Sequence, residues 1–377
     1  MGLISNNFLF MVYRVFILFL FLSPLFGYLF DTYFLKNRVL KNTLSSGNKL
    51  ALVCAHNEEK VISNIIKDCF LSGFNKVFVI LDSCTDKTKS ICNSLGVDFV
   101  EVNVRSKSRA LNYGIKYLKG YYGLRGFNRY DVYFFDADNR IDKDFLKFAS
   151  RYVGFYGVVQ FRVRNLSYNS SISKMYSIMF GYLFRLQSFL RSVSVSNLVC
   201  GTGFAMRSDI FNKYVFDFKT NTDLEYSIKL NHRIIYINYP VVFDEKPNSF
   251  IISFKQRVRW VRGHLDLFFS NWGGYQKGKL FILVFPVLDV LMLFLFFYNI
   301  FYLRLNFVFA FAVSYFINLG YYFVLCFDDD LKHLKFYDFL LFGFFSLSHY
   351  LVIIVALLTM KNRKKWFRTP HKGGVIC

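Results

Sequence analysis

The chain has 377 residues, enough for one sizeable domain with added elements or for two modest domains. Its aromatic content of 21% and its positive mean hydropathy depart from an average soluble protein and indicate that part of it lies in lipid. A formal net charge of +22 would suit nucleic acid, but much of the positive charge flanks apolar runs, which favours anionic lipid headgroups instead. We therefore expect membrane lipids, and no nucleic acid, as partners.

The first predicted element is an N-terminal transmembrane helix at residues 8–35, because an apolar run of this length can cross a bilayer. It lacks a convincing cleavage site, so we interpret it as a retained anchor rather than a signal peptide. The seven cysteines form no CxxC pair and have no His partner at zinc spacing. We interpret them as reduced thiols facing a cytosol.

From Leu50 onwards, short strands alternate with amphipathic helices, which is typical of an α/β domain with a mostly parallel sheet. We assign this domain to residues 48–249. The predicted strands are 50–55, 76–82, 98–102 and 131–135, and the predicted helices are 58–72, 85–95, 107–119 and 173–192. A glycine-bearing turn follows at 200–211, and another helix begins near 221–225.

Polar side chains follow three of these strands: residues 56–58, Asp82, and the pair Asp136 and Asp138. Open sheets of this kind bind ligands at the carboxyl ends of their strands. Side chains two apart in a strand point the same way, so Asp136 and Asp138 can converge on one cation or one hydroxyl-rich ligand. Taken alone, the pattern is more often a polar strand end before a turn.

The C-terminal part is predicted to lie at or in a membrane. Residues 250–278 contain an amphipathic, basic helix suited to a membrane surface, residues 280–360 contain two to three transmembrane helices, and residues 361–377 are a basic tail. The apolar segments are 280–303, 305–327 and 336–360. Three spans would put the basic tail outside, against the positive-inside rule, unless one segment is re-entrant or interfacial.

Seven short motifs occur in a fixed order between residues 50 and 265. They are AHNEE (55–59), LDSCTD (81–86), SKSRALN (106–112), DADN (136–139), CGTGFA (200–205), TDLEYS (222–227) and QRVRW (256–260). In this order the chain resembles the membrane-bound family-2 glycosyltransferases, a group that includes cellulose, chitin, hyaluronan and poly-N-acetylglucosamine synthases and ceramide glucosyltransferases. The resemblance implies a GT-A fold and sugar transfer from a nucleotide diphosphate donor, usually UDP-linked.

The resemblance also implies roles on the donor side. Ala55, Asn57 and Glu58 would bind the donor, Asp82 would face the uracil and Lys107 would neutralise the phosphates. A divalent cation, Mg or Mn, would be held by Asp138 and by Asp136, which could instead bind the ribose or the sugar. Without the resemblance, Lys107 is a solvated lysine at a helix start and Asp82 a strand-end turn residue.

On the acceptor side, the resemblance implies that Asp223 is the catalytic base and that the acceptor is bound by Gly203, Gln256, Arg259 and Trp260, with Trp260 stacking on a sugar ring. The chain departs from the family in having Thr222 where an acid is usual and Ser106 where a glycine is usual. Alone, Asp223 could serve as a helix N-terminal carboxylate, and Arg259 with Trp260 as an interfacial anchor.

We therefore expect an inverting, metal-dependent transferase that moves a sugar from a nucleotide diphosphate donor, a UDP-sugar such as UDP-GlcNAc or UDP-glucose, to a growing saccharide through a β-glycosidic bond. We expect a multi-pass protein of the inner or plasma membrane with its catalytic domain facing the cytosol. The alternatives are transfer of a single sugar to a lipid-linked acceptor, and a catalytically silent membrane subunit. Four spans are few for a polymer channel, so a channel would need a homo-oligomer or an accessory subunit.

Overall fold

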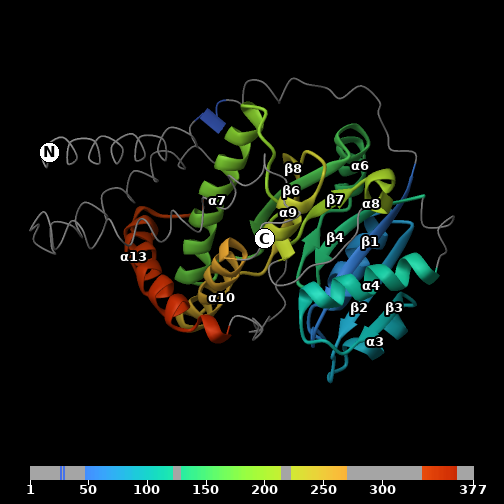
Figure 1. The fold of residues 1–377 in the computed structure, drawn as a ribbon, viewed down its shortest axis with the longest axis horizontal. Coiled ribbons are helices and arrows are strands. Elements are labelled where there is room, and N and C mark those ends of the chain that lie inside the picture. The colour runs from blue at the N-terminus through green and yellow to red at the C-terminus, as the bar shows by residue number, and fades with distance from the viewer. Residues whose placement is uncertain are drawn as a thin grey trace, which may run out of the picture.

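The computed structural model describes residues 26, 27, 29, 47–121, 129–213, 222–269 and 333–362. Within these ranges the strands form one eight-stranded sheet, in the order β3-β2-β1-β4-β7-β6-β8-β5 (Figure 1). The strands are β1 Asn48–Ala55, β2 Lys76–Asp82, β3 Asp98–Val102, β4 Tyr130–Asp136, β5 Arg140–Ile141, β6 Val158–Asn165, β7 Phe204–Met206 and β8 Ile235–Asp244. The helices are α2 Ile62–Ser72, α3 Thr88–Ser94, α4 Lys107–Tyr121, α6 Phe145–Tyr156, α7 Ser171–Ser192, α8 Ser208–Lys213, α9 Thr222–Lys229, α10 Phe250–Phe269 and α13 Phe336–Leu358, with a 3-10 turn at Met360–Asn362.

The first half of the sheet is parallel. Strand β1 pairs with β2 on one side and with β4 on the other, and β2 pairs with β3. These strands are nearly continuous apolar runs such as KVFVILD, as expected for parallel strands covered on both faces. Because they run in one direction, the polar residues that follow β1, β2 and β4 lie at one edge of the sheet.

Helices cover both faces, as the alternation of side chains along each strand requires. On one face, Val53, Val79 and Phe135 pack against α2, α3 and α6. On the other face, Leu52 and Phe134 pack against α4, α8 and α9. This three-layer α/β arrangement agrees with the predicted fold class.

The second half of the sheet is mixed. The three-residue strand β7 runs antiparallel to both β4 and β6, β6 is parallel to β8, and β5 is antiparallel to β8. The insertion of β7 beside β4 brings the preceding glycine-bearing turn next to the end of β4. The predicted mostly parallel sheet is therefore a mixed, mostly parallel one.

The remaining helices α7, α10 and α13 pack together beside the sheet (Figure 1). Buried residues of α7 and α13 share one apolar cluster, and those of α10 and α13 share another. Polar contacts run the length of α13: Asp338 pairs with Lys174 of α7 at 3.3 Å, and Arg257 of α10 donates to the Ser348 hydroxyl at 2.9 Å. Near the end of α13, Arg262 of α10 donates to the Thr359 hydroxyl.

Helix α13 has 23 residues and includes an 18-residue stretch with a mean hydropathy of 2.2. In the part of the chain that the structure describes, it alone is long and apolar enough to cross a membrane. Its exposed face carries an apolar stripe formed by Tyr337, Leu341, Phe344, Leu351 and Leu358. The predicted spans 280–303 and 305–327, and nearly all of 8–35, lie outside the described residues. One helix of this kind supports membrane contact weakly, because a core helix passes the same test of length and composition.

Candidate active site

The turns after β1 and β2 hold each other at the carboxyl edge of the sheet. The Asn57 side-chain carbonyl accepts the Thr85 N–H at 2.7 Å, and the Glu58 N–H donates to the Thr88 hydroxyl at 2.8 Å. Asn57 adopts a left-handed backbone with φ 57°, a conformation that Asn tolerates better than most residues. These contacts explain why α2 and α3 begin three to four residues later than predicted from the sequence.

Lys107 and Asp136 meet across this edge. The Lys107 Nζ lies 2.5 Å from Asp136 Oδ1 and donates to the Gly201 carbonyl oxygen at 3.1 Å. Lys107 begins α4, Asp136 ends β4 and Gly201 belongs to the turn before β7. Two predicted donor-site residues, 29 positions apart in the sequence, are therefore in direct contact.

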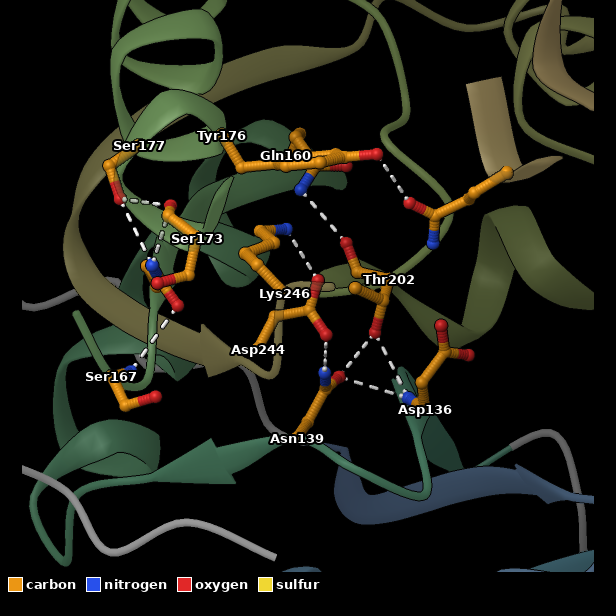
Figure 2. A network of polar contacts seen from close by, with 12 residues as sticks. Asp136, Asn139, Gln160, Ser167, Ser173, Tyr176, Ser177, Thr202, Asp244 and Lys246 are labelled. Atoms are coloured by element: carbon orange, nitrogen blue, oxygen red, sulfur yellow. Dashed lines mark hydrogen bonds and ion pairs between the residues drawn. The ribbon is translucent and has the colours of Figure 1, made fainter. Parts of the chain in front are cut away.

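Two buried polar side chains, those of Asn139 and Thr202, hold the turn that starts with Asp136 (Figure 2). The Asp136 N–H donates to Asn139 Oδ1 at 2.9 Å and to the Thr202 hydroxyl oxygen at 3.0 Å. The Thr202 hydroxyl in turn donates to Asn139 Oδ1. In Figure 2 the Asp136 carboxylate points away from this network, so the network holds the backbone and leaves the carboxylate at the site.

Gln160 holds the turn before β7. Its amide nitrogen donates to the carbonyl oxygens of Thr202 and Gly203, both at 3.0 Å, and its amide oxygen accepts the Cys200 N–H at 2.8 Å. Gln160 is fully buried in β6, so this amide satisfies backbone groups that water cannot reach. The turn that contacts both Lys107 and Asp136 is thereby anchored to the sheet.

The predicted acceptor residue Gly203 lies in the same turn but is itself buried. Its N–H donates to the Phe134 carbonyl at 2.9 Å and its carbonyl accepts from the Phe161 N–H. Its φ is 65°, and an added Cβ would lie 3.1 Å from Val242. The position thus needs glycine for backbone reasons, and it is Gly201 that lines the pocket beside Lys107.

The buried network extends from Asn139 toward α7. The Asn139 amide nitrogen donates to Asp244 Oδ1 at 3.4 Å, and Lys246 Nζ lies 2.6 Å from Asp244 Oδ2. The same ammonium group lies 3.8 Å from the centre of the Phe180 ring. The donor-side turn is therefore connected, through side chains only, to the helix that packs against α10.

Asp136 ends β4, and Asp138, which is 7% exposed, lies in the turn that follows it. Within the described ranges, three or more His, Cys, Asp or Glu side chains do not gather anywhere into a group that could hold a metal ion. Two carboxylates fit a cation such as Mg²⁺ or Mn²⁺ only where substrate phosphates supply further oxygens, which is the common arrangement at nucleotide sites. The chemistry of the donor set is compatible with that arrangement.

A pocket opens beside the Lys107 and Asp136 pair. Its lining is mainly apolar: Leu52, Cys54, Leu111, Phe134, Val199, Phe204 and Tyr226. Burial raises the pKa of the Cys54 thiol to about 12, and nearby Lys107 opposes this only in part. Cys54 is therefore a neutral thiol at physiological pH rather than a thiolate nucleophile.

The predicted acceptor residues on α10 lie apart from that pocket lining. Gln256 Oε1 accepts the Tyr176 hydroxyl at 2.9 Å. The Trp260 ring makes edge contacts with Tyr176 at 6.1 Å and with Phe180 at 6.3 Å, measured between ring centres. Trp260 and Gln256 thus contact α7 in the structure, and Trp260 is partly buried in the cluster shared with α13.

Within the same motif, Arg257 is the most buried residue, at 2% exposure. It donates to the Phe345 carbonyl and the Ser348 hydroxyl of α13, and its guanidinium lies 4.1 Å from the Phe345 ring centre. Desolvation lowers the pKa of Arg257 to about 10, so it stays charged at neutral pH. Arg257 therefore joins α10 to α13.

The predicted base, Asp223, is the second residue of α9. Its side chain lies outside the described part of the structure, so its distance to the other site residues is not assigned. The backbone of α9 is placed by Tyr226, which lines the pocket.

Sequence reasoning missed several residues that shape the site. Asn139 and Thr202 stand inside the DADN and CGTGFA motifs, and these motifs were the signal for them. The only sequence signal for Gln160 is its own position, as a polar residue in the middle of the apolar run VVQFRV. Asp244 and Lys246 had no recognisable signal.

Comparison with protein families gives a match over residues 48–263, to the sequence profile described as "Glycosyltransferase like family 2". This range is more than half of the chain and contains all seven motifs. Comparison with curated protein sequences gives no match.

Comparison with solved structures gives distant similarities. The mannosyltransferase PcManGT of Pyrobaculum calidifontis, in complex with GDP-Man and Mn²⁺, has a TM-score of 0.54 and 14% identity, covering 93% of this chain and 98% of that one. TarS 1-349 of S. aureus with UDP-GlcNAc has a TM-score of 0.40 and 13% identity, covering 84% and 82%. Glucosyl-3-phosphoglycerate synthase of Mycobacterium tuberculosis has a TM-score of 0.39 and 16% identity, covering 60% and 80%. The similarity to the mannosyltransferase shows the same overall fold.

Proposed function

Because the chain belongs to glycosyltransferase-like family 2, and so is a glycosyltransferase, we propose that it transfers a sugar from a nucleoside diphosphate donor to an acceptor hydroxyl with inversion. The observation that carries the proposal is the contact of Lys107 with Asp136 beside Gly201, at the edge where the parallel strands end. A lysine, a carboxylate and a backbone turn meet there, and a fixed positive charge of this kind supports recognition of a charged diphosphate.

On the donor side, Lys107 would pair with the diphosphate, whose negative charge grows as the glycosidic bond breaks. Asp138 and Asp136 would hold a divalent cation, which when bound stabilises the same leaving charge. Ala55 ends β1, and Asn57 and Glu58 lie in the turn that follows; these three residues would contact the nucleoside. Since the mannosyltransferase structure contains GDP-Man and Mn²⁺, GDP-mannose is tested beside UDP-GlcNAc and UDP-glucose.

On the acceptor side, Asp223 would take the proton of the attacking hydroxyl, and the new bond would form on the face of the sugar opposite the leaving diphosphate. Gln256, Arg259 and Trp260 would bind the acceptor, a growing saccharide. The apolar stripe of α13 favours the second candidate, a single transfer to a lipid-linked acceptor, since such an acceptor would be held at a membrane. We place the protein at the inner or plasma membrane with its catalytic domain on the cytosolic side.

The test is incubation of the full-length protein, in membranes, with labelled nucleotide sugars in the presence and absence of Mn²⁺ or Mg²⁺. We expect release of nucleoside diphosphate and a labelled product only with the cation. A ladder of products indicates saccharide extension, whereas one glycolipid indicates the second candidate. An Asp223→Asn variant should bind nucleotide normally but lose about 10²- to 10⁴-fold in rate. Full activity of that variant would remove Asp223 as the base, and no product from any donor would favour a silent subunit.

A further inference from the structure

Asn139 holds the turn that begins at Asp136, and it can do so in only one orientation of its side-chain amide. The residue is fully buried, and its Oδ1 accepts the Asp136 N–H at 2.9 Å and the Thr202 hydroxyl. A flipped amide would direct its own N–H groups at the Asp136 N–H, which is also a donor, and would remove this acceptor. The direction of the Asn139 amide therefore decides whether the turn keeps these hydrogen bonds.

The carboxylate of Asp244 favours the orientation that the turn requires. The Asn139 Nδ2 donates to Asp244 Oδ1 at 3.4 Å, and an ionised carboxylate can only accept hydrogen bonds. A flipped amide would place its oxygen beside this anion, which is repulsive. Asp244 ends β8, where its carbonyl oxygen accepts the Leu166 N–H at 2.9 Å, so the sheet fixes its backbone. The charge on Asp244 thus selects between the two orientations of Asn139.

Lys246 stabilises the charge on Asp244. Its Nζ lies 2.6 Å from Asp244 Oδ2, and the two side chains are 5% and 19% exposed. A carboxylate largely removed from water is costly unless a cation pairs with it. The same ammonium group lies 3.8 Å from the centre of the Phe180 ring, so Lys246 is also held by α7. Figure 2 shows Asp244 between Lys246 and Asn139.

We propose that Asp244 and Lys246 are positioning residues of the donor site. Their ion pair fixes the amide of Asn139, and Asn139 holds the turn that carries Asp136 and Asp138, the carboxylates proposed to bind a divalent cation. Both residues act through Asn139, and neither touches the donor. The inference rests on the proposed function, because it concerns the cation of that same site. The family resemblance implies no role for Asp244 or Lys246.

The test measures binding of Mn²⁺ to the full-length protein in the presence of UDP or of GDP, from the electron paramagnetic resonance signal of free Mn²⁺. Asp244→Asn keeps the shape of the side chain and removes its charge. Lys246→Met keeps an apolar stem over Phe180 and removes the ammonium group. We expect Asp244→Asn to weaken Mn²⁺ binding by about tenfold to a hundredfold, as loss of a residue that orients a metal site does.

Lys246→Met separates positioning from the effect of charge alone. Loss of a positive charge near the site would by itself strengthen the binding of a cation. Positioning predicts the opposite, a weaker Mn²⁺ affinity that changes in the same direction as in Asp244→Asn. The variant with both substitutions should bind Mn²⁺ within about twofold of Asp244→Asn, because Lys246 acts through Asp244.

An exchange of the amide and the carboxylate tests the orientation directly. Asn139→Asp combined with Asp244→Asn keeps the net charge and lets every contact form again. The carboxylate at position 139 accepts from the turn, while the amide at position 244 donates to it and accepts from Lys246. We expect this exchange to recover most of the Mn²⁺ affinity that Asp244→Asn alone loses.

Lys49→Met is the matched control. Lys49 pairs with the fully buried Asp131 at 2.9 Å, near the amino ends of β1 and β4 and so away from the donor turn. Loss of this buried pair should lower the melting temperature and leave Mn²⁺ binding unchanged.

Unchanged or stronger Mn²⁺ binding by Lys246→Met would overturn the inference while leaving the proposed function standing. Additive losses in the variant with both substitutions, or an equal loss in Lys49→Met, would also overturn it. Where Lys246→Met does not fold, the exchange decides: recovery supports the inference and no recovery overturns it. If the wild type binds no Mn²⁺ with either nucleotide, the proposed metal-dependent function fails and the inference fails with it.

Discussion

Lys107 and Asp136 form an ion pair across the carboxyl edge of the sheet, with 2.5 Å between Nζ and Oδ1. Their side chains remain 25% and 32% exposed, so a ligand can reach both. In the proposed function, an incoming diphosphate would compete with Asp136 for the lysine, and a cation would compete with Lys107 for the carboxylate. A diphosphate that pairs with Lys107 frees Asp136 for the cation, and a cation that binds Asp136 frees Lys107 for the diphosphate. We therefore expect diphosphate and cation to bind cooperatively.

Replacement of Lys107 by Ala should reduce kcat/KM for the donor by about 10²- to 10³-fold, because a fixed positive charge at the leaving diphosphate is lost. Lys107→Arg should recover part of the activity. Lys116→Ala is the control, since Lys116 is an exposed lysine of the same helix α4. Steady-state rates with each donor give the comparison, and equal losses in the Lys107 and Lys116 variants would contradict the assigned role.

Thr202→Val should destabilise the Asp136 turn. The substitution keeps the shape of the side chain but removes the hydroxyl that joins the Asp136 N–H to Asn139. We expect a loss of about 1 kcal/mol in the free energy of unfolding and reduced activity, while Thr202→Ser retains both. Chemical unfolding measures the change in stability, and the rate of donor turnover measures the change in activity. A fully active Thr202→Val protein would show that the hydroxyl is dispensable to the site.

The sequence predicted the parallel half of the sheet well, because apolar runs such as residues 76–82 carry the signal for a covered strand. The short strand β7 was not predicted, because three residues are too few to show the alternation of apolar and polar side chains that marks a strand. Its pairing with β4 and β6 also depends on segments that are distant in the sequence. The motifs located Lys107 and Asp136, but not their contact. The burial of Gly203 and the backbone N–H groups that contact Asp82 depend on tertiary contacts between segments distant in sequence.

Trp260 offers a test that separates packing from acceptor binding. Its edge contacts with Tyr176 and Phe180 predict that Trp260→Ala loses about 3 kcal/mol of stability, as large-to-small changes in apolar clusters do. Trp260→Phe should keep most of this packing. If Trp260 also binds the acceptor, Trp260→Phe will raise the acceptor KM with little change in the melting temperature. An unchanged KM would leave Trp260 with a packing role only.

Cys54 gives a prediction about pH. Its thiol has a pKa of about 12 in the folded protein, raised by burial above the ordinary value of 9.0. The stabilising effect of keeping it neutral is therefore fully present below about pH 9 and is lost as the pH rises toward 12. At about pH 8 we expect iodoacetamide to modify Cys54 far more slowly than it modifies a thiol peptide, with no loss of activity. Labelling is followed by mass spectrometry, and modification of Cys54 as fast as that of the thiol peptide would contradict the prediction.

The exposed stripe of α13 should contact lipid. Leu351 is 58% exposed on a helix whose other face packs against α7 and α10, and this arrangement leaves one apolar side for an apolar partner. A photo-crosslinking benzoylphenylalanine in place of Leu351, in full-length protein reconstituted into vesicles of phosphatidylcholine and phosphatidylglycerol, should form adducts with lipid. The same replacement at Leu71 is the control, because Leu71 is 74% exposed on α2, which covers the parallel part of the sheet. Lipid adducts at Leu351 alone are the expected result. Crosslinks from Leu351 only to protein would show that another segment or another copy of the chain covers the stripe.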